Sequence, residues 1–397
     1  MTGPSSISRR TALAGAATAL VAALAACTGR RRGGGSVTTT DGASTTVASA
    51  TTVVPVATVP VTTVPVTTVP VTTVPVTTVA PATDAYFPPI DGDWATISAT
   101  DAGFTDAGLA EVLALVERSN SQSFVLTING RIVAEQYWQG ADAATRRDIA
   151  SAQKSVTSTL MGLARDRGLL TFDQSVTSFL GAGWTAADVA DEAQITLLQL
   201  MTMSSGLDPV TMTKKAAPGT VWEYNTDAYQ RLRPVLEAAS GRDINALSGE
   251  WLFDEIGLVD RNSWYRRPAM KDALGNVLWG LNLTAREMTR FGLFAMRGGQ
   301  WAGRQITDPA WFAEAWTSIP LKVEYGYLWW LLGKGRLGRR GAPADLVAAL
   351  GAQDQKIYVI PSMGLVLARQ GGAADDTTAA ESDFDTALIA AIGRARG

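Results

Sequence analysis

The sequence predicts an α+β fold, in which an antiparallel sheet flanked by terminal helices carries a helical subdomain. Strand patterns occur near both ends of the globular region, at 123–138 and at 356–370. The long region between them, 170–320, consists mostly of predicted helices and loops. Because each strand must bury an apolar face, these distant segments are expected to pair in one sheet, as in α+β domains.

The first elements of the domain follow from local patterns. Residues 105–119 place apolar side chains at helical spacing after a Thr/Asp cap, which predicts an amphipathic helix. Residues 123–138 alternate in polarity around Asn129-Gly130, and this dipeptide is the strongest short signal for a β-hairpin. The sequence therefore predicts a helix followed by a hairpin.

Three further elements complete the expected domain. A helix is predicted from Ser151 to about Arg167, where a glycine follows. Near the end of the chain, 356–360 and 365–370 read as two strands joined by a Pro-Ser-Met-Gly turn. A last helix is predicted at 383–395.

Residues 1–26 have the pattern of an export signal. The paired Arg9 and Arg10 precede an apolar run that is too short for an ordinary membrane span, which predicts a twin-arginine signal peptide. The run ends in Leu-Ala-Ala-Cys, which resembles a bacterial lipobox. We therefore expect cleavage before Cys27 and lipidation of Cys27. The alternative is that Cys27 is an ordinary cysteine of a discarded signal.

Residues 27–85 are expected to form a disordered stalk rich in Thr, Pro and Val. Five prolines recur at every fifth position between 55 and 75. This spacing excludes a helix and weakens any strand pairing. Together with the export signal and Cys27, the stalk predicts that residues 86–397 form a domain outside the cytoplasm, anchored by lipid to the outer face of the cytoplasmic membrane in the cell envelope. The membrane is thus an expected partner.

The composition excludes several classes of function. The chain of 397 residues contains no histidine and one cysteine, so Ser-His-Asp and Cys-His catalysis and cysteine-rich zinc sites are excluded. The formal net charge of −3 gives no indication of a nucleic-acid partner. No Gly-x-Ser-x-Gly motif is present. No metal or cofactor is expected.

A serine and a lysine lie three residues apart at the start of the helix predicted from Ser151. In Ser-Ala-Gln-Lys, Lys154 projects from the same side of the helix as Ser151. A lysine can accept the serine proton only when it is neutral, and burial together with the positive helix end lowers its pKa. Lys154 is therefore the candidate base for a Ser151 nucleophile. The alternative is a solvated lysine beside a helix-capping serine.

From this motif onward the chain resembles the serine hydrolases related to class C β-lactamases, which include penicillin-binding DD-peptidases, esterases and aminohexanoate-oligomer hydrolases. The resemblance spans roughly residues 95–395. Six segments match family blocks in the expected order, at 151–176, 195–207, 218–243, 281–301, 324–331 and 351–371. The resemblance implies a β-lactamase/DD-peptidase-like fold and a catalytic role for Ser151 and Lys154.

The resemblance also implies a catalytic tyrosine on a loop of the helical region. The matching residue is Tyr224, in Tyr-Asn-Thr. A phenol beside a cationic lysine can ionise at reduced cost and relay a proton to the leaving group. The family asparagine two positions later is Thr226 here, so a hydroxyl is the expected substrate contact. Asn225 and Asp227 are adjacent alternatives.

A third family element faces the serine from a strand. Where the family has Lys-Thr-Gly or His-Thr-Gly, this chain has Ala-Leu-Gly at 349–351, so the cation that helps hold a substrate carboxylate is missing. Gly351 allows close approach of a substrate. The resemblance implies that the N–H groups of Ala352 and Ser151 form an oxyanion hole. Trp279 is a further candidate for substrate binding.

Two adjacent tryptophans have two interpretations. Trp329 and Trp330 can line a pocket, but a tryptophan pair in an apolar strand more often belongs to the core.

Together these features predict an exported serine hydrolase that cleaves an ester or amide through an acyl-enzyme. The missing cation favours an esterase or amidase of the aminohexanoate-hydrolase type. A D-Ala-D-Ala carboxypeptidase or β-lactamase is the first alternative, because an arginine elsewhere can supply the charge. A wall-binding lipoprotein without turnover is the second alternative.

Overall fold

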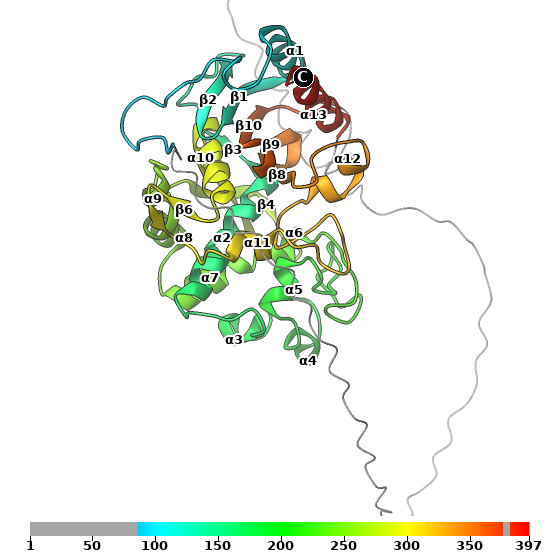
Figure 1. Ribbon diagram of the computed structural model, residues 1–397. Helices are drawn as coiled ribbons and strands as arrows, with labels where there is room; N and C mark the ends of the chain where they lie inside the picture. The colour runs from blue at the N-terminus through cyan, green and yellow to red at the C-terminus, as the bar shows by residue number, and fades with distance from the viewer. Residues whose placement is uncertain (1–85, 376–381, 397) are drawn as a thin grey trace, which may run out of the picture. The chain divides into compact units, whose positions relative to one another are not determined.

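The computed structural model describes residues 86–375 and 382–396 (Figure 1). The predicted signal peptide at 1–26, the lipidation site Cys27 and the stalk at 27–85 lie outside the described residues. Within the described ranges, no helix combines the length and apolar character needed to cross a membrane.

A five-stranded antiparallel sheet joins the two ends of the domain, as the sequence predicts. Its strand order is β2-β1-β10-β9-β8. The strands are β1 (Ser121–Ile128), β2 (Arg131–Tyr137), β8 (Val347–Gly351), β9 (Gln355–Ile360) and β10 (Leu365–Gly371). Asn129 and Gly130 connect β1 to β2 with φ angles of 48° and 88°, the left-handed conformation that this dipeptide favours. The α+β fold and the predicted hairpin are confirmed.

Alternate side chains of the sheet enter two different cores. One face, with Phe124 and Leu367, packs under α1 (Asp106–Arg118) and α13 (Asp383–Ala395), which lie side by side (Figure 1). The other face, with Val366, packs against α10 (Ala285–Met296). A Cβ added at Gly292 of α10 would lie 2.5 Å from a methyl group of Val366, so this glycine lets the helix approach the sheet closely.

The region between β2 and β8 is mainly helical, as predicted. Its helices are α2 (Gln153–Asp166), α3 (Thr177–Leu180), α4 (Val189–Glu192), α5 (Leu197–Met201), α6 (Thr226–Tyr229), α7 (Leu232–Ser240), α8 (Ile244–Ser248), the π-helical η3 (Gly249–Phe253), α9 (Asp254–Ile256), α11 (Trp311–Ala315) and α12 (Arg336–Arg339). Short 3₁₀ turns are η2 (Ala150–Ala152), η4 (Leu332–Lys334), η5 (Ala352–Asp354) and η6 (Pro361–Met363).

The structure adds strands that the sequence analysis did not predict. A three-stranded sheet has the order β3-β5-β4, with β3 (Arg147–Asp148), β4 (Trp264–Lys271) and β5 (Val277–Leu283). A two-stranded ribbon consists of β6 (Gln300–Trp301) and β7 (Arg304–Gln305). The strand β4 was not predicted because it lacks an alternating hydrophobic pattern. Several of its residues are exposed, and it contains two arginines and a proline.

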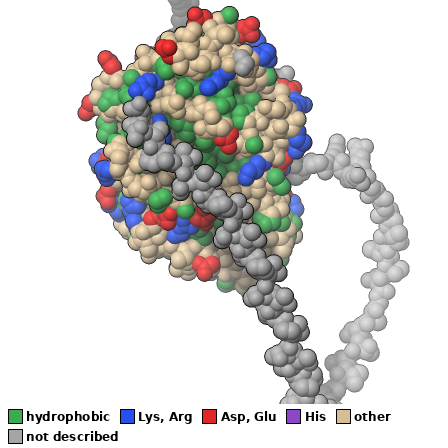
Figure 2. Space-filling model, viewed as in Figure 1, with side chains coloured by type: hydrophobic (Ala, Val, Ile, Leu, Met, Phe, Trp, Pro, Cys, Tyr) green, Lys and Arg blue, Asp and Glu red, His purple; other side chains and the backbone are tan. Residues whose placement is uncertain are grey.

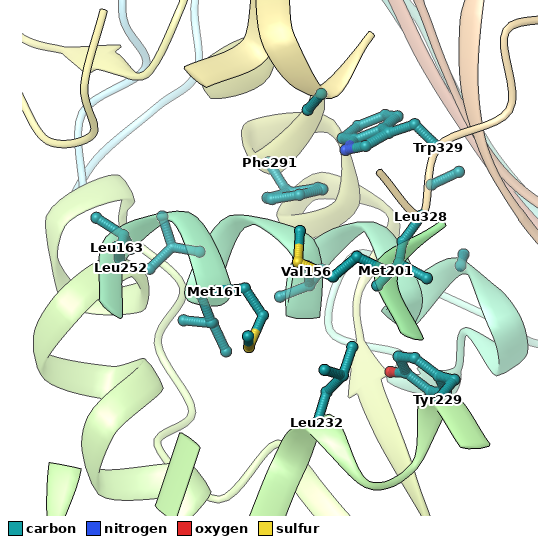
Figure 3. Packing of buried hydrophobic residues seen from close by; sticks show 14 of the residues in the cluster. Val156, Met161, Leu163, Met201, Tyr229, Leu232, Leu252, Phe291, Leu328 and Trp329 are labelled. Carbon is teal, nitrogen blue, oxygen red and sulfur yellow. The ribbon is translucent and has the colours of Figure 1, made fainter. Parts of the chain in front are cut away.

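The helix α2 passes through the centre of the larger core. Every residue from Gln153 to Ala164 is buried, so the helix is covered on all sides and not only on its apolar face. Figure 3 shows Val156, Met161 and Leu163 among side chains from other helices and from the segment at Trp329. The buried hydroxyl of Ser155 is satisfied because it donates a hydrogen bond to the Leu328 carbonyl at 2.8 Å. The dense packing fixes the position of the residues at the start of α2.

Figure 2 shows one face of the molecule, on which acidic and basic side chains are interspersed. This pattern agrees with the near balance of 34 basic and 37 acidic residues in the chain. Where described side chains are visible on that face, no large patch of one sign stands out (Figure 2).

Candidate active site

Ser151 and Lys154 are in direct contact at the start of α2. The Lys154 ammonium nitrogen Nζ lies 3.1 Å from Oγ of Ser151 and 3.5 Å from Oγ1 of Thr226. Ser151 itself lies in the 3₁₀ turn η2, and α2 begins two residues later than predicted, at Gln153. This junction keeps the serine one turn before the lysine, as the motif requires.

Lys154 is buried between two tyrosine rings. Its side chain is 2% exposed, and Nζ lies 4.9 Å from the ring centre of Tyr224 and 4.4 Å from that of Tyr229. The Tyr229 hydroxyl is paired with Thr157 at 2.8 Å, which leaves its ring face toward the lysine. The alternative of a solvated lysine beside a capping serine is therefore wrong.

The electrostatic environment favours the neutral form of Lys154. Burial is the main cause and the positive charge of Arg267 is the second, and together they lower the pKa of Lys154 to about 7. The carboxylate of Asp227 acts in the opposite direction. A lysine with this pKa is substantially neutral at physiological pH, which is the state that a proton acceptor needs.

Tyr224 presents its phenol to the nucleophile. Burial raises the pKa of Tyr224 to about 12, although a hydrogen bond with Ser151 lowers it in part. Desolvation is therefore the dominant influence on the pKa of the Tyr224 phenol, in place of the expected easing of ionisation by a cationic lysine. With this pKa the Tyr224 phenol keeps its proton in the resting site. The phenol contacts Ser151, the predicted nucleophile.

Asp148, three positions before Ser151, holds the backbone that leads to the serine. Asp148 accepts hydrogen bonds from the Ala150 N–H at 2.9 Å, from the Tyr265 hydroxyl at 2.7 Å and from the Arg267 guanidinium at 2.5 and 2.7 Å. Ala150 is held at a φ of 49°, which is unusual for a residue with a side chain. The network supports this strained position immediately before the serine.

Sequence reasoning did not find Asp148, Tyr265 or Arg267. Tyr265 and Arg267 come from β4, more than a hundred residues after Asp148. The alternation of Tyr265 and Arg267 along one strand was the only signal in the sequence.

The strand that carries the third predicted element lies against the turn before Ser151. Gly351 ends β8, and a Cβ there would overlap the carbonyl oxygen of Ile149 and lie 3.2 Å from Cβ of Ala150. The glycine therefore allows close approach of the strand to the turn that carries Ser151. Ala352, the next residue, begins the turn η5 and is exposed.

The turn after Ala352 is held from behind by a buried arginine. Arg369 donates to the carbonyl oxygens of Gln353 and Asp354, both at 3.0 Å. Gln353 and Asp354 each have a φ of 59°, so the turn takes a left-handed course. These contacts fix the direction of the backbone at Ala352.

The remaining predicted residues are placed differently. Thr226 contacts the lysine, as described above. Asn225 is buried and caps α6 by accepting from the Ala228 N–H at 2.9 Å, so it has a structural role. Asp227 accepts from the Ala273 N–H at 2.8 Å. Trp279 lies against the Arg233 guanidinium at 4.5 Å, and its link to α2 runs through its backbone carbonyl, which accepts from Gln153.

The tryptophan pair divides between the two roles considered. Trp329 is fully buried and stacks on Phe291 with ring centres 5.9 Å apart, so it belongs to the core. Trp330 is partly exposed and stacks on Tyr224 at 6.1 Å. The second tryptophan therefore lies beside the candidate catalytic group.

No cluster of three or more Cys, Asp or Glu side chains suited to a metal ion occurs in residues 86–375 and 382–396. The side chains that meet at Ser151 supply a hydroxyl, an amine and a phenol.

Comparison with known proteins identifies the family of the chain. The family model described as Beta-lactamase matches residues 114–388. The 6-aminohexanoate-dimer hydrolase of Paenarthrobacter ureafaciens is 20% identical over 324 residues, which cover 70% of this chain and 80% of that protein.

Solved structures show the same fold. A provisionally named 6-aminohexanoate-dimer hydrolase from Bacillus anthracis superposes with a TM-score of 0.60 at 18% identity, covering 78% of this chain and 88% of that one. A family VIII carboxylesterase superposes with a TM-score of 0.58 at 16% identity, covering 77% and 99%. Because the family match spans most of the described residues, this chain belongs to the beta-lactamase family and is a serine hydrolase of that family.

Proposed function

We propose that the protein cleaves an ester or amide through an acyl-enzyme formed on Ser151, with Lys154 and Tyr224 as general base and acid. One observation carries the proposal: a buried amine whose pKa is lowered to about 7 lies 3.1 Å from the serine hydroxyl. Nucleophilic serines require an adjacent base of this kind when no histidine is available.

The proposed proton route is supported by the contacts of Ser151 with Lys154 and with Tyr224. Nζ of Lys154 accepts the proton of Ser151 Oγ as that oxygen attacks the carbonyl carbon. The carbonyl oxygen becomes an oxyanion, which the N–H groups of Ser151 and Ala352 bind in this proposal. Tyr224 donates its proton to the leaving oxygen or nitrogen and regains one from the Lys154 ammonium. Water then attacks the acyl-enzyme by the same route in reverse, releasing the acid and restoring Ser151.

The groups around the serine favour a substrate without a carboxylate. Ala349 stands where the family places a cation. The Arg267 guanidinium is engaged by Asp148 through two of its nitrogens, so it is not free to replace that cation. The names of the relatives, a dimer hydrolase and a carboxylesterase, agree with an esterase or amidase. D-Ala-D-Ala carboxypeptidase and β-lactamase activities are the alternatives that a substrate panel separates.

We further propose that the enzyme works outside the cytoplasm, attached to the membrane by a lipid on Cys27. The proposal is supported by the arginine pair, the apolar run and the small residues before the cysteine. Metabolic labelling with an alkyne fatty acid should mark the wild-type protein in the membrane fraction. The Cys27→Ala protein should carry no label. An unlabelled wild-type protein, or equal labelling of both proteins, would contradict the anchor.

The catalytic proposal is tested by active-site labelling and a substrate panel. A fluorophosphonate should label the wild-type protein at Ser151, and Ser151→Ala should abolish labelling. Ser178→Ala, a change at an exposed serine, is the matched control and should label normally. Short p-nitrophenyl esters should be hydrolysed, whereas nitrocefin and D-Ala-D-Ala peptides should turn over slowly. Absence of labelling at Ser151 would support a protein without turnover.

A further inference from the structure

Three aromatic rings form a continuous surface beside the candidate catalytic residues. This aromatic wall consists of Trp222, Tyr224 and Trp330. Tyr224 and Trp330 are stacked, with ring centres 6.1 Å apart and planes inclined by 25°. Trp222 lies 6.5 Å from Tyr224 and 6.2 Å from Trp330. All three side chains are only partly buried, so the wall keeps an accessible surface next to the lysine and serine.

The backbone holds the wall in place. Trp330 exchanges two hydrogen bonds with Ala348, at 2.8 and 3.0 Å, and thereby extends the main sheet beyond the edge strand β8. Ala348 lies three residues before Gly351, whose strand faces Ser151. Trp222 also packs edge to face on Tyr325, with ring centres 5.5 Å apart. A surface fixed in this way is preformed, which reduces the entropy lost on binding.

An apolar rim continues the wall to the surface. Lys322 lies over the Trp222 ring at 5.2 Å and is tied to Glu324 at 2.9 Å, which places this segment beside the wall. Its neighbours Leu321 and Val323 are exposed, as is Val221 next to Trp222. Large apolar side chains exposed around a binding site are typical of surfaces that contact a ligand.

One polar group in the wall lacks a partner. The indole Nε1 of Trp222 is buried, and within the described residues it has no hydrogen-bond acceptor. Trp311, Trp316 and Trp329, which lie outside the wall, share this condition, so the unpartnered N–H does not by itself mark a ligand site.

We infer that the aromatic wall binds an apolar leaving group, the alcohol or amine part of a neutral ester or amide. The inference rests on the proposed function, in which Tyr224 donates its proton to the leaving group. Because Tyr224 is itself a ring of the wall and Trp330 stacks on it, a group lying on the wall is the group that receives this proton. The bond from the carbonyl carbon to the leaving oxygen or nitrogen breaks, and the Tyr224 proton completes the released alcohol or amine.

The leaving group and the acyl group of the substrate can be tested separately, because they act in different kinetic steps. All acetate esters give the same acetyl-enzyme, so a subsite for the leaving group affects acylation and not deacylation. Methyl, butyl and benzyl acetate have alcohols of similar basicity but very different apolar area. We expect kcat/KM to rise by about tenfold or more from methyl to benzyl acetate, the scale of discrimination in apolar pockets.

Variants of the wall test this expectation. Trp330→Leu and Trp222→Ala should remove most of the benzyl-over-methyl preference. The rate of acetyl-enzyme breakdown, measured after rapid acylation, should stay within about twofold of wild type. Trp222→Phe should keep the preference and lose only the indole N–H. Trp279→Ala is the matched control, because that partly buried tryptophan lies against Arg233 rather than in the wall, and its preference should be unchanged.

The outcomes distinguish the inference from the proposed function. If Ser151 is not labelled by a fluorophosphonate and no ester is hydrolysed, the proposed function fails. If Ser151 labels and esters turn over, but benzyl and methyl acetate react equally in the wild type, the inference is wrong. It is also wrong if Trp330→Leu changes the preference among acyl groups at constant alcohol while leaving the alcohol preference intact.

Discussion

The guanidinium of Arg267 binds both carboxylate oxygens of Asp148, at 2.5 and 2.7 Å, three residues before Ser151. The two residues come from strands of the small sheet, β4 and β3, which are joined by β5 between them. The pair serves two purposes at once. Asp148 orients the turn before the serine through the Ala150 N–H, and the charge of Arg267 disfavours protonation of Lys154.

Removal of the arginine charge should move the pH profile of the enzyme. The wild-type kcat/KM should rise with pH as Lys154 loses its proton, with a midpoint near the pKa of about 7. Arg267→Gln removes a positive neighbour, so the pKa of Lys154 should rise and the midpoint should move to higher pH. The measurement is the pH dependence of kcat/KM for a p-nitrophenyl ester.

A neighbouring arginine provides the control for this shift. Arg266 is exposed and adjacent in the same strand. Arg266→Gln changes the net charge equally and should leave the midpoint in place. If both variants shift the midpoint by the same amount, Arg267 acts only through the overall charge of the protein.

Replacement of Lys154 should lower the activity of the enzyme and raise its stability. Lys154→Met should lower kcat by at least about a hundredfold, the usual contribution of a general base. The same change removes a buried amine whose pKa falls from the ordinary lysine value of 10.5 to about 7 in the folded protein. The unfolded chain therefore binds more protons between these values, and wild-type stability rises with pH across that window.

The stability gain of Lys154→Met should consequently depend on pH. It should be largest below pH 7, where the folded protein holds the ammonium in a buried site, and should fade toward pH 10.5. Urea unfolding at about pH 6.5, just below this window, and at about pH 9.5, near its upper end, measures how far the gain has faded. An equal gain at both pH values would mean that the amine is not desolvated in the folded protein.

A buried ionic cluster behind the turn η5 should contribute strongly to the stability of the fold. Lys356 is paired with Asp354 at 2.9 Å and with Asp385 at 2.8 Å, and it is almost wholly inaccessible. Asp385→Ala leaves the ammonium with one partner and should destabilise the protein by about 3–5 kcal/mol. Denaturant unfolding measures the loss.

The Asp385→Ala change should also lower activity, because it loosens the contact that holds Asp354. Because Asp354 lies in the turn that begins at Ala352, loosening the cluster should also lower the labelling rate at Ser151 under conditions where the variant is still folded. Asp383→Asn, on the exposed side of the same helix, is the control and should alter neither property by more than about 0.5 kcal/mol or twofold.

The glycine at the end of β8 should tolerate no side chain. A Cβ at position 351 would overlap the Ile149 carbonyl oxygen and press on Ala150. Gly351→Ala should therefore push the strand away from Ser151 and lower kcat/KM by about tenfold or more, since small displacements of catalytic groups are costly. Gly393→Ala, where the added methyl meets open space in α13, should leave activity unchanged. Steady-state kinetics compare the two.

The sequence predicted the elements that are determined locally. Asn129-Gly130 defined its hairpin because only a few residue types adopt two left-handed conformations in succession. The contact between Ser151 and Lys154 followed from the geometry of one helical turn. Tyr224 was found by the order of family blocks and not by its own surroundings.

The parts that were missed depend on contacts between distant segments. The pairing of Asp148 with Arg267 joins residues 119 positions apart and has no local signature. Trp279 was predicted as a candidate for substrate binding, and its side chain lies on Arg233, a contact that the sequence does not signal. The different roles of Trp329 and Trp330 became distinguishable only when the bridge to Ala348 showed which ring faces Tyr224.

The position of β10 has a consequence for biosynthesis. This strand, Leu365–Gly371, lies between β1 and β9 in the middle of the main sheet, although it is encoded in the last tenth of the chain. A nascent polypeptide therefore carries the β1–β2 hairpin with one unpaired edge until translation has passed residue 371, and such edges promote aggregation. Truncation of the chain a few dozen residues before its end should thus yield insoluble protein instead of a less active enzyme. The main sheet beside Ser151 can be completed only when synthesis of the chain is nearly finished.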